Sequence, residues 1–112
     1  MVNFLKETTD VLVKHNKSWC DVHFIRTNRV QVKDIEKFKK SMDFEYDNGY
    51  GSEEIPLDLI VAGKDWWLER HEYDGSEWWE YKSIPSSSNN SEDVVLRKGD
   101  FGLYIVVKDE VK

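Results

Sequence analysis

The sequence predicts an α+β fold in which two helices pack on one face of a mainly antiparallel sheet of four to five strands. Apolar residues recur at helical spacing in two stretches of the first 42 residues, and strand-like patterns dominate after them. The connections in this second part are short, which favours antiparallel neighbours. A chain of 112 residues has the size of one domain. We therefore expect a single α+β domain over residues 1–112.

Two helices are expected, over residues 3–16 and 32–42. In the first, one face repeats every three or four positions up to Asn16, a residue typical of helix ends (Phe4, Leu5, Thr8, Val11, Leu12, His15). In the second, apolar residues share one face and lysines occupy the rest (Ile35, Phe38, Met42; Lys33, Lys37, Lys39, Lys40). A short strand over 21–27 is expected between the two helices.

The remainder of the chain reads mainly as strands. Segments of alternating or continuous apolar character predict strands at 43–47, 57–62, 65–73, 76–83 and 103–107. Asp74-Gly75 between two of them is the dipeptide preferred by a two-residue type I′ turn, so 65–83 is expected to form a β-hairpin. The polar run 86–93 is expected to be a flexible loop.

A turn at Asp74-Gly75 sets the register of this hairpin, because Tyr73 then pairs with Ser76. The face expected to point to the core holds seven residues, with Arg70 stacked on an indole near its rim (Trp66, Leu68, Arg70, Glu72, Glu77, Trp79, Tyr81). The other face is expected to be partly solvated. There Glu69 should lie opposite Glu80, and His71 opposite Trp78.

Charge is distributed unevenly along the chain. The net charge is −6, but residues 1–42 hold nine Lys or Arg against five Asp or Glu. Residues 43–80 hold twelve acidic residues against Lys64 and Arg70 alone. Such a balance disfavours direct binding to nucleic acid or to an anionic membrane, and it favours a basic protein partner or a cation. Alternatively, the acidic residues serve only as a solvated surface.

The acidic residues of the predicted strands suggest a partner-binding face. Alternate side chains along a strand repeat every ~6.6 Å, a spacing comparable to that of backbone phosphates. We therefore expect one acidic sheet face, with Trp67 and Trp78 beside it, that mimics the charge of nucleic acid (Asp43, Glu45, Asp47, Glu69, Glu80). The expected partner is a basic protein, of a kind that handles nucleic acid.

A metal site is the alternative interpretation of the same hairpin. Two directly opposed carboxylates repel each other, and a bound divalent metal at Glu69, His71 and Glu80 would compensate, as a metal-assisted hydrolase requires. Arg70 and Lys82 are also near enough in sequence to neutralise the pair. Residues 43–54 echo a calcium loop, but Asn48 stands where that loop needs glycine. No nucleophile, base and orienter set is present, so neither an enzyme nor a cofactor is the leading expectation.

The compartment is expected to be the cytoplasm. The sequence has no apolar run long enough to cross a membrane and no signal-like N-terminus. Cys20 is the sole cysteine, so no intramolecular disulfide forms, and a reducing compartment fits. We expect Cys20 to be buried or chemically neutral.

The segment Leu68–Lys82 is similar to a family of small proteins encoded by bacteriophages and prophages, and Tyr46–Gly51 and the Phe38 helix fit the same pattern. The similarity covers roughly residues 3–85. It implies a phage-borne accessory protein acting in the host cytoplasm, without functional residues to carry over. Together with the charge, it favours a protein that binds and inhibits a basic host protein, as an anti-defence factor or an antitoxin does. The alternative within this resemblance is a phage structural or assembly component that self-associates through Trp67, Tyr73 and Trp78.

Overall fold

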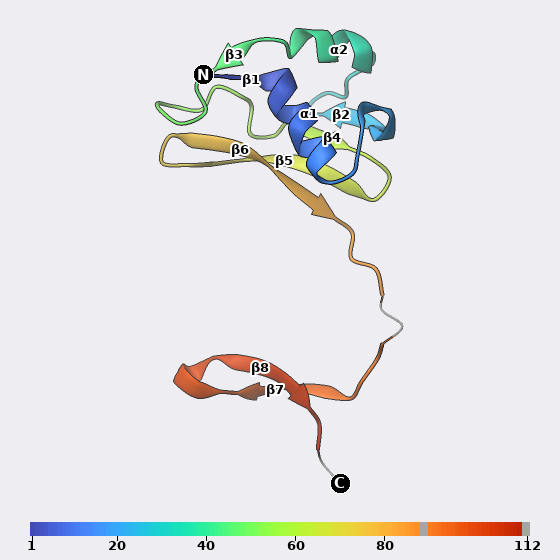
Figure 1. Cartoon of the computed structure of the whole chain (residues 1–112), viewed down its shortest axis with the longest axis vertical. Helices are drawn as coiled ribbons and strands as arrows, with labels where there is room; N and C mark the ends of the chain where they lie inside the picture. The colour runs from blue at the N-terminus through green and yellow to red at the C-terminus, as the bar shows by residue number, and fades with distance from the viewer. Residues whose placement is uncertain (88–89, 111–112) are drawn as a thin grey trace.

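The computed structural model describes residues 1–87 and 90–110 and has the α+β architecture that the sequence predicts (Figure 1). In chain order its elements are β1 (Val2–Asn3), α1 (Phe4–Lys14), η1 (Trp19–Asp21), β2 (Phe24–Arg26), α2 (Ile35–Ser41), β3 (Glu45–Tyr46), β4 (Ile60–Ala62), β5 (Trp66–Tyr73), β6 (Ser76–Ser83), β7 (Val94–Lys98), η2 (Asp100–Gly102) and β8 (Tyr104–Lys108). Within the described ranges, no helix is long and apolar enough to cross a membrane.

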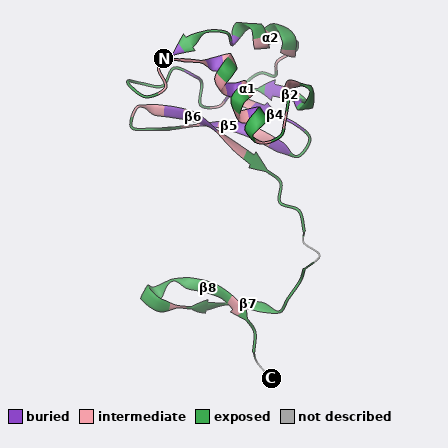
Figure 2. Cartoon of the chain, viewed as in Figure 1, coloured by how far each residue is buried: buried purple, intermediate pink, exposed green. Residues whose placement is uncertain are grey.

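The main sheet has four strands in the order β2-β4-β5-β6, all antiparallel. Buried residues lie on α1 and on the strands of this sheet, as the purple segments in Figure 2 show. α1 meets β6 directly: the Trp79 indole donates a hydrogen bond to the Thr8 hydroxyl at 2.8 Å, and the rings of Phe4 and Trp79 stack. From α2, Ile35 and Phe38 pack against the same core. We call residues 1–83 the body.

The first helix begins where its sequence provides a cap. The Asn3 side chain accepts a hydrogen bond from the Lys6 backbone N–H at 2.9 Å, which satisfies one of the donors left free at a helix start. Phe4, Thr8 and Leu12 are buried, one per turn. After His15 the chain turns through a positive φ of 61° at Asn16, so the helix ends within two residues of the predicted boundary.

The second helix is shorter than predicted. Residues 30–32 are extended instead, because the Val32 N–H donates to the Ile25 carbonyl at 2.8 Å and Gln31 bridges to Arg26. The helix starts only after Asp34, whose carboxylate caps the Lys37 N–H at 3.1 Å. The backbone hydrogen bond to β2 therefore forms in place of the first turn of the predicted helix.

The β5–β6 hairpin confirms both the predicted turn and the predicted register. Asp74 and Gly75 have positive φ of 50° and 87°, as a type I′ turn requires. Tyr73 pairs with Ser76, Glu69 with Glu80 and His71 with Trp78. The predicted inward face is buried apart from Glu72, which is exposed, and Tyr81, which is partly buried.

The strand predicted at 43–47 is reduced to Glu45–Tyr46 and does not join the main sheet. It pairs with β1, and Met42 and Phe44 accept backbone hydrogen bonds from the start of α1 (Leu5 N–H at 3.0 Å, Phe4 N–H at 2.9 Å). β3 therefore pairs with β1 and not with a strand of the main sheet. Tyr46 is buried while Phe44 is exposed, so only one of the two aromatic residues points into the core.

The chain beyond the body forms a second hairpin that the sequence predicted only in part. The strand expected at 103–107 is β8, and it pairs with β7, a strand that the sequence reading missed. Figure 1 draws this C-terminal hairpin apart from the body. Residues 84–87 and 90–93 form no helix or strand, while residues 88–89 of the predicted 86–93 loop lie outside the described ranges.

Candidate functional site

The most strongly built polar cluster of the body surrounds Arg70, at the inner face of the hairpin. Its Nη2 donates to Glu77 Oε1 at 3.0 Å and to the Tyr46 hydroxyl at 3.1 Å, and its Nη1 lies 3.6 Å from Glu7 Oε1. The guanidinium lies over the Trp79 ring at 4.8 Å. The predicted stacking of Arg70 on an indole is confirmed. Its predicted position near the rim is wrong, because carboxylates from α1 and β6 converge on the guanidinium inside the core.

Tyr46 completes this cluster. Its hydroxyl donates to Glu7 Oε1 at 2.5 Å while it accepts from Arg70. Burial, followed by the hydrogen bond to the Glu7 carboxylate, raises the pKa of the Tyr46 hydroxyl far above its ordinary value. The phenol consequently stays protonated and acts as a fixed hydrogen-bond donor.

Glu77 ties the loop between β3 and β4 to the hairpin. Its carboxylate accepts the backbone N–H groups of Glu54 at 2.8 Å and Ile55 at 3.1 Å, and its own N–H donates to the Asn48 carbonyl at 2.7 Å. The loop also meets the hairpin turn, since a Cβ added at Gly75 would lie 3.3 Å from the Gly51 oxygen. The buried Glu77 carboxylate thereby positions residues 47–54. The role of this cluster is structural.

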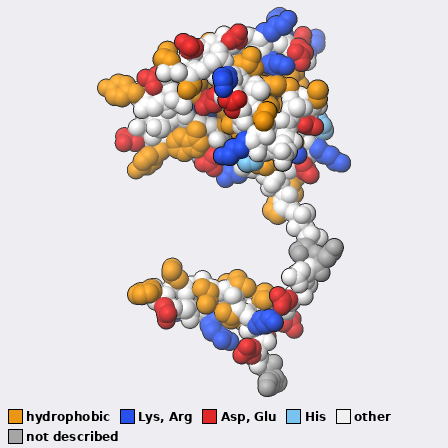
Figure 3. All heavy atoms as spheres, in the orientation of Figure 1, with side chains coloured by type: hydrophobic (Ala, Val, Ile, Leu, Met, Phe, Trp, Pro, Cys, Tyr) orange, Lys and Arg blue, Asp and Glu red, His pale blue; other side chains and the backbone are white. Residues whose placement is uncertain are grey.

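This arrangement gathers acidic residues at one end of the body. The loop, the end of β5 and the turn together carry five of them, which we call the acidic end; Asp47 is half-buried and the others are exposed (Asp47, Glu53, Glu54, Glu72, Asp74). Two tyrosines project beside them, Tyr50 at 82% exposure and Tyr73 at 76%. In Figure 3, red carboxylates and protruding orange side chains meet where the β5–β6 turn and this loop lie in Figure 1. No cation of the 43–80 segment lies there, because Arg70 is buried and Lys64 precedes β5.

The outer face of the hairpin carries a second group of carboxylates, and these are bound to their neighbours. Glu69 accepts the Trp67 indole N–H at 2.7 Å and lies 2.6 Å from His71 Nε2. Glu80 accepts the Trp78 indole N–H at 3.1 Å and lies 3.2 Å from Lys82 Nζ. His71 Nδ1 is 3.5 Å from Glu80 Oε2, so the imidazole lies between the two opposed carboxylates.

These contacts shift the acidity of both carboxylates. The Trp67 indole, and then His71, lower the pKa of Glu69 below its ordinary value. The Trp78 indole, and then Lys82, lower the pKa of Glu80. Both groups therefore stay ionised at neutral pH, and the repulsion expected between them is relieved by indole, imidazole and ammonium groups.

The metal alternative finds no support in this geometry. Among the described residues, no group of three or more His, Cys, Asp and Glu is placed to hold a metal ion. Glu69, His71 and Glu80 do come together, as the register predicts, but they direct their polar atoms at one another and at the two indoles. Of the two predicted neutralising cations, Lys82 contacts the group and Arg70 points into the core on the other side.

The single acidic sheet face predicted from the sequence is not formed. Asp43, Glu45 and Asp47 belong to the segment that pairs with β1, whereas Glu69 and Glu80 lie on the main sheet. Asp43 Oδ1 also accepts a hydrogen bond from the Asn3 side chain at 2.8 Å. Trp67 and Trp78 lie half-buried beside Glu69 and Glu80. Only Asp47 of the five predicted acids belongs to the acidic end.

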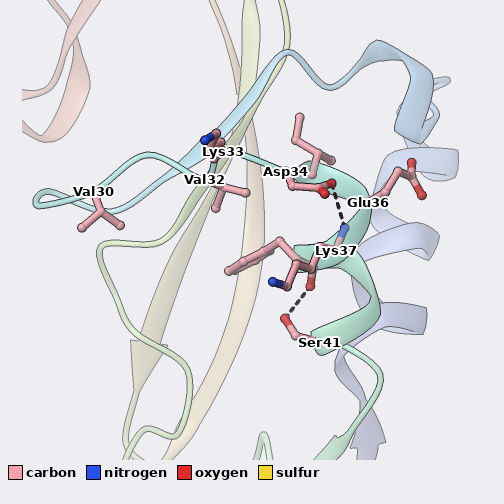
Figure 4. A pocket seen from close by; sticks show the side chains of 9 residues that line it. Val30, Val32, Lys33, Asp34, Glu36, Lys37 and Ser41 are labelled. Atoms are coloured by element: carbon pink, nitrogen blue, oxygen red, sulfur yellow. Dashed lines mark hydrogen bonds between the residues drawn. The ribbon is translucent and has the colours of Figure 1, made fainter.

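An open hollow lies on another side of the body, between residues 30–33 and α2 (Figure 4). It measures about 1020 Å³, and Val32 and Phe38 contribute apolar surface to it. Two of its polar side chains make contacts within the helix: Asp34 caps α2, and Ser41 donates to the Phe38 carbonyl. The residues that line it include no histidine and no cysteine.

Cys20 is not buried, contrary to one of the two expectations for it. It is exposed on η1 rather than buried, and no other cysteine exists in the chain.

No protein-family model, curated protein or solved structure matches this chain. The surface most suited to a function is therefore the acidic end, and the sequence signal that could have located it is the Asp74-Gly75 turn together with the acids on either side.

Proposed function

We propose that this protein binds a basic protein partner through its acidic end. The observation that carries the proposal is the arrangement of charge and aromatic surface: five acidic side chains lie around the exposed Tyr50 and Tyr73. The buried pairing of Arg70 with Glu77 removes one of the two cations of this segment from the surface. The charge that residues 43–80 place at this end is therefore negative.

This combination suits a protein–protein interface better than other functions. Clustered negative charge repels nucleic acid and anionic lipid, and it accelerates encounter with a positive surface. Tyrosine is enriched among the residues that dominate binding energy, because it offers a large contact area and a hydroxyl at little entropic cost. The Glu77 contacts hold the loop against the hairpin, so less conformational entropy is lost on binding.

The resemblance to phage-encoded proteins supports a more specific version. In it the partner is a host protein that handles nucleic acid, and the acidic end occupies the basic surface that would otherwise contact nucleic acid. The partner is then inhibited by competition in the host cytoplasm. An antitoxin that covers a basic toxin uses the same physical principle.

The proposal is tested with tagged protein added to bacterial lysate at low and high salt, with captured proteins identified by mass spectrometry. We expect a basic partner that is retained at low salt and released at high salt, because interactions between exposed charges are screened. Recovery of no partner at either salt concentration would contradict the proposal.

Two matched double variants locate the surface. Glu53→Lys with Glu72→Lys reverses charge at the acidic end, and both residues are exposed. Asp10→Lys with Glu36→Lys makes the same change in net charge on exposed positions of α1 and α2. The first pair should abolish capture and the second should retain it. Equal loss in both would show that overall charge, and not the acidic end, drives binding.

A further inference from the structure

The C-terminal hairpin exposes an unusual amount of apolar surface. Among the described residues sixteen large hydrophobic side chains are exposed, and eight of them lie between residues 94 and 106. The described core of the body contains no residue of this hairpin. A two-stranded hairpin alone is marginally stable in water, and apolar surface of this kind marks an interaction site. Another surface is therefore needed to cover the hairpin.

The register of β7 and β8 divides the side chains between two faces. Val95 pairs with Val107, and Arg97 with Ile105, on one face. The backbone of Asp93 accepts the Asp109 N–H at 3.0 Å, which places these two residues at the open end of the same face. We call this the Val95 face. The opposite face, which we call the Leu96 face, is formed by three further pairs (Val94 with Lys108, Leu96 with Val106, Lys98 with Tyr104).

The Val95 face is complementary to itself under two-fold rotation. The Val95–Val107 pair lies in its middle, Arg97 lies one row towards the turn, and Asp93 and Asp109 lie one row towards the open end. Arg97 and Asp93 are four residues apart on one strand, roughly 14 Å, which is too far to pair within a hairpin. A two-fold axis along the Val95–Val107 pair brings Arg97 of one copy over Asp93 of the other.

The Leu96 face lacks this property. Lys98 and Lys108 lie on either side of the central Leu96–Val106 pair. The same two-fold operation on this face would place Lys98 of one copy over Val94 and next to Lys108 of the other, and neighbouring like charges oppose association. Charge therefore distinguishes two faces that are similar in apolar content.

We propose that two copies of this chain associate through their Val95 faces, with valine pairs packed together and Arg97 of each copy against Asp93 of the other. The two hairpins then form a small sandwich with a dry centre and charged ends. Ten residues, 84–93, connect the hairpin to the body. Such a length spans at most about 35 Å, which leaves room for both bodies beside the sandwich.

Sedimentation velocity of the full chain across the micromolar range tests the proposal, with Val95→Glu and Leu96→Glu as matched variants on neighbouring residues of β7. We expect the unmodified chain and Leu96→Glu to be dimers and Val95→Glu to be a monomer. All five tryptophans lie between residues 19 and 79, so an unchanged tryptophan fluorescence spectrum confirms that the body is folded in each variant. An unmodified chain that stays monomeric overturns the proposal, as does equal dissociation by both variants.

A charge exchange tests the orientation without removing apolar surface. Arg97→Asp should weaken the dimer by about tenfold, since each dimer has two such contacts and an exposed ion pair contributes up to about 1 kcal/mol. Adding Asp93→Arg to the same chain recreates both contacts with reversed sign and should restore the dimer. Failure of this second change to restore any affinity would overturn the two-fold arrangement.

Discussion

Arg70 and Glu77 face each other across the inner side of the β5–β6 hairpin and form an ion pair with an Nη2–Oε1 distance of 3.0 Å. Their side chains are 0% and 2% exposed. Burial of two charges is costly, so the pair is maintained by its geometry and by the backbone N–H groups of Glu54 and Ile55. The pair joins the hairpin, the loop and α1 in one network.

Removing one partner of this pair should be strongly destabilising. Glu77→Ala leaves the Arg70 guanidinium buried with Glu7 as its remaining carboxylate, and it leaves two backbone N–H groups unpaired. We expect the free energy of unfolding to fall by about 3–5 kcal/mol, measured by urea denaturation. Glu72→Ala is the control, because Glu72 lies directly opposite Glu77 but is exposed. A loss below about 0.5 kcal/mol is expected for it, and similar losses for both variants would contradict this account.

Thr8→Val should expose the dependence of the core on one hydroxyl. Thr8 Oγ1 accepts the Trp79 indole N–H at 2.8 Å and donates to the Phe4 carbonyl at 2.8 Å. Valine has nearly the same shape and cannot accept, so a buried indole N–H loses its partner at a cost of about 1–3 kcal/mol. Thermal unfolding followed by tryptophan fluorescence measures the change. Thr8→Ser keeps the hydroxyl and should retain more of the stability than valine does; a valine variant as stable as the unmodified chain would disprove the role of this contact.

Gly75→Ala should destabilise the hairpin turn. Gly75 has a φ of 87°, and an added Cβ would meet the Gly51 oxygen at 3.3 Å, so both backbone strain and crowding act against alanine. We expect a loss of about 1–2 kcal/mol in chemical denaturation. Gly49→Ala is the matched control in the adjoining loop, where φ is not in the left-handed region and the nearest atom to an added Cβ is 4.0 Å away. If Gly49→Ala were the more damaging change, the turn would not be the sensitive point.

Stability should depend on pH through the outer-face carboxylates. The pKa values of Glu69 and Glu80 are lowered in the folded protein from 4.5, so the unfolded chain binds more protons than the folded protein as pH falls. Their contribution is present above pH 4.5 and is lost as pH decreases through the folded pKa values. Urea denaturation between pH 7 and pH 3 should show this loss. Glu69→Gln should reduce the slope in this window, and an unchanged slope would show that Glu69 does not contribute.

The local features of this chain followed from its sequence. The Asp74-Gly75 turn, the pairing of Glu69 with Glu80 and the inward set containing Trp66, Leu68 and Trp79 depend on turn chemistry and on the two-residue period of a strand. Both act over a few residues. The start of α1 after Asn3 is local in the same sense, because the cap lies three residues from the N–H that it binds.

Tertiary structure alone decided which segments meet. Val2–Asn3 pairs with Glu45–Tyr46, so these residues do not join the predicted acidic face. Glu7 and Tyr46 contact Arg70 from positions distant in sequence. β7 escaped prediction because its apolar residues are continuous and then give way to Arg97-Lys98, without the alternation of a half-buried strand. The pattern of apolar residues indicates which side of a helix or strand is buried. It does not indicate which other segment covers that side, because all strands and helices compete for backbone partners and for the core. The sequence by itself therefore determined the α+β class and the hairpin register, and only the tertiary contacts decided where the charges of this protein are exposed.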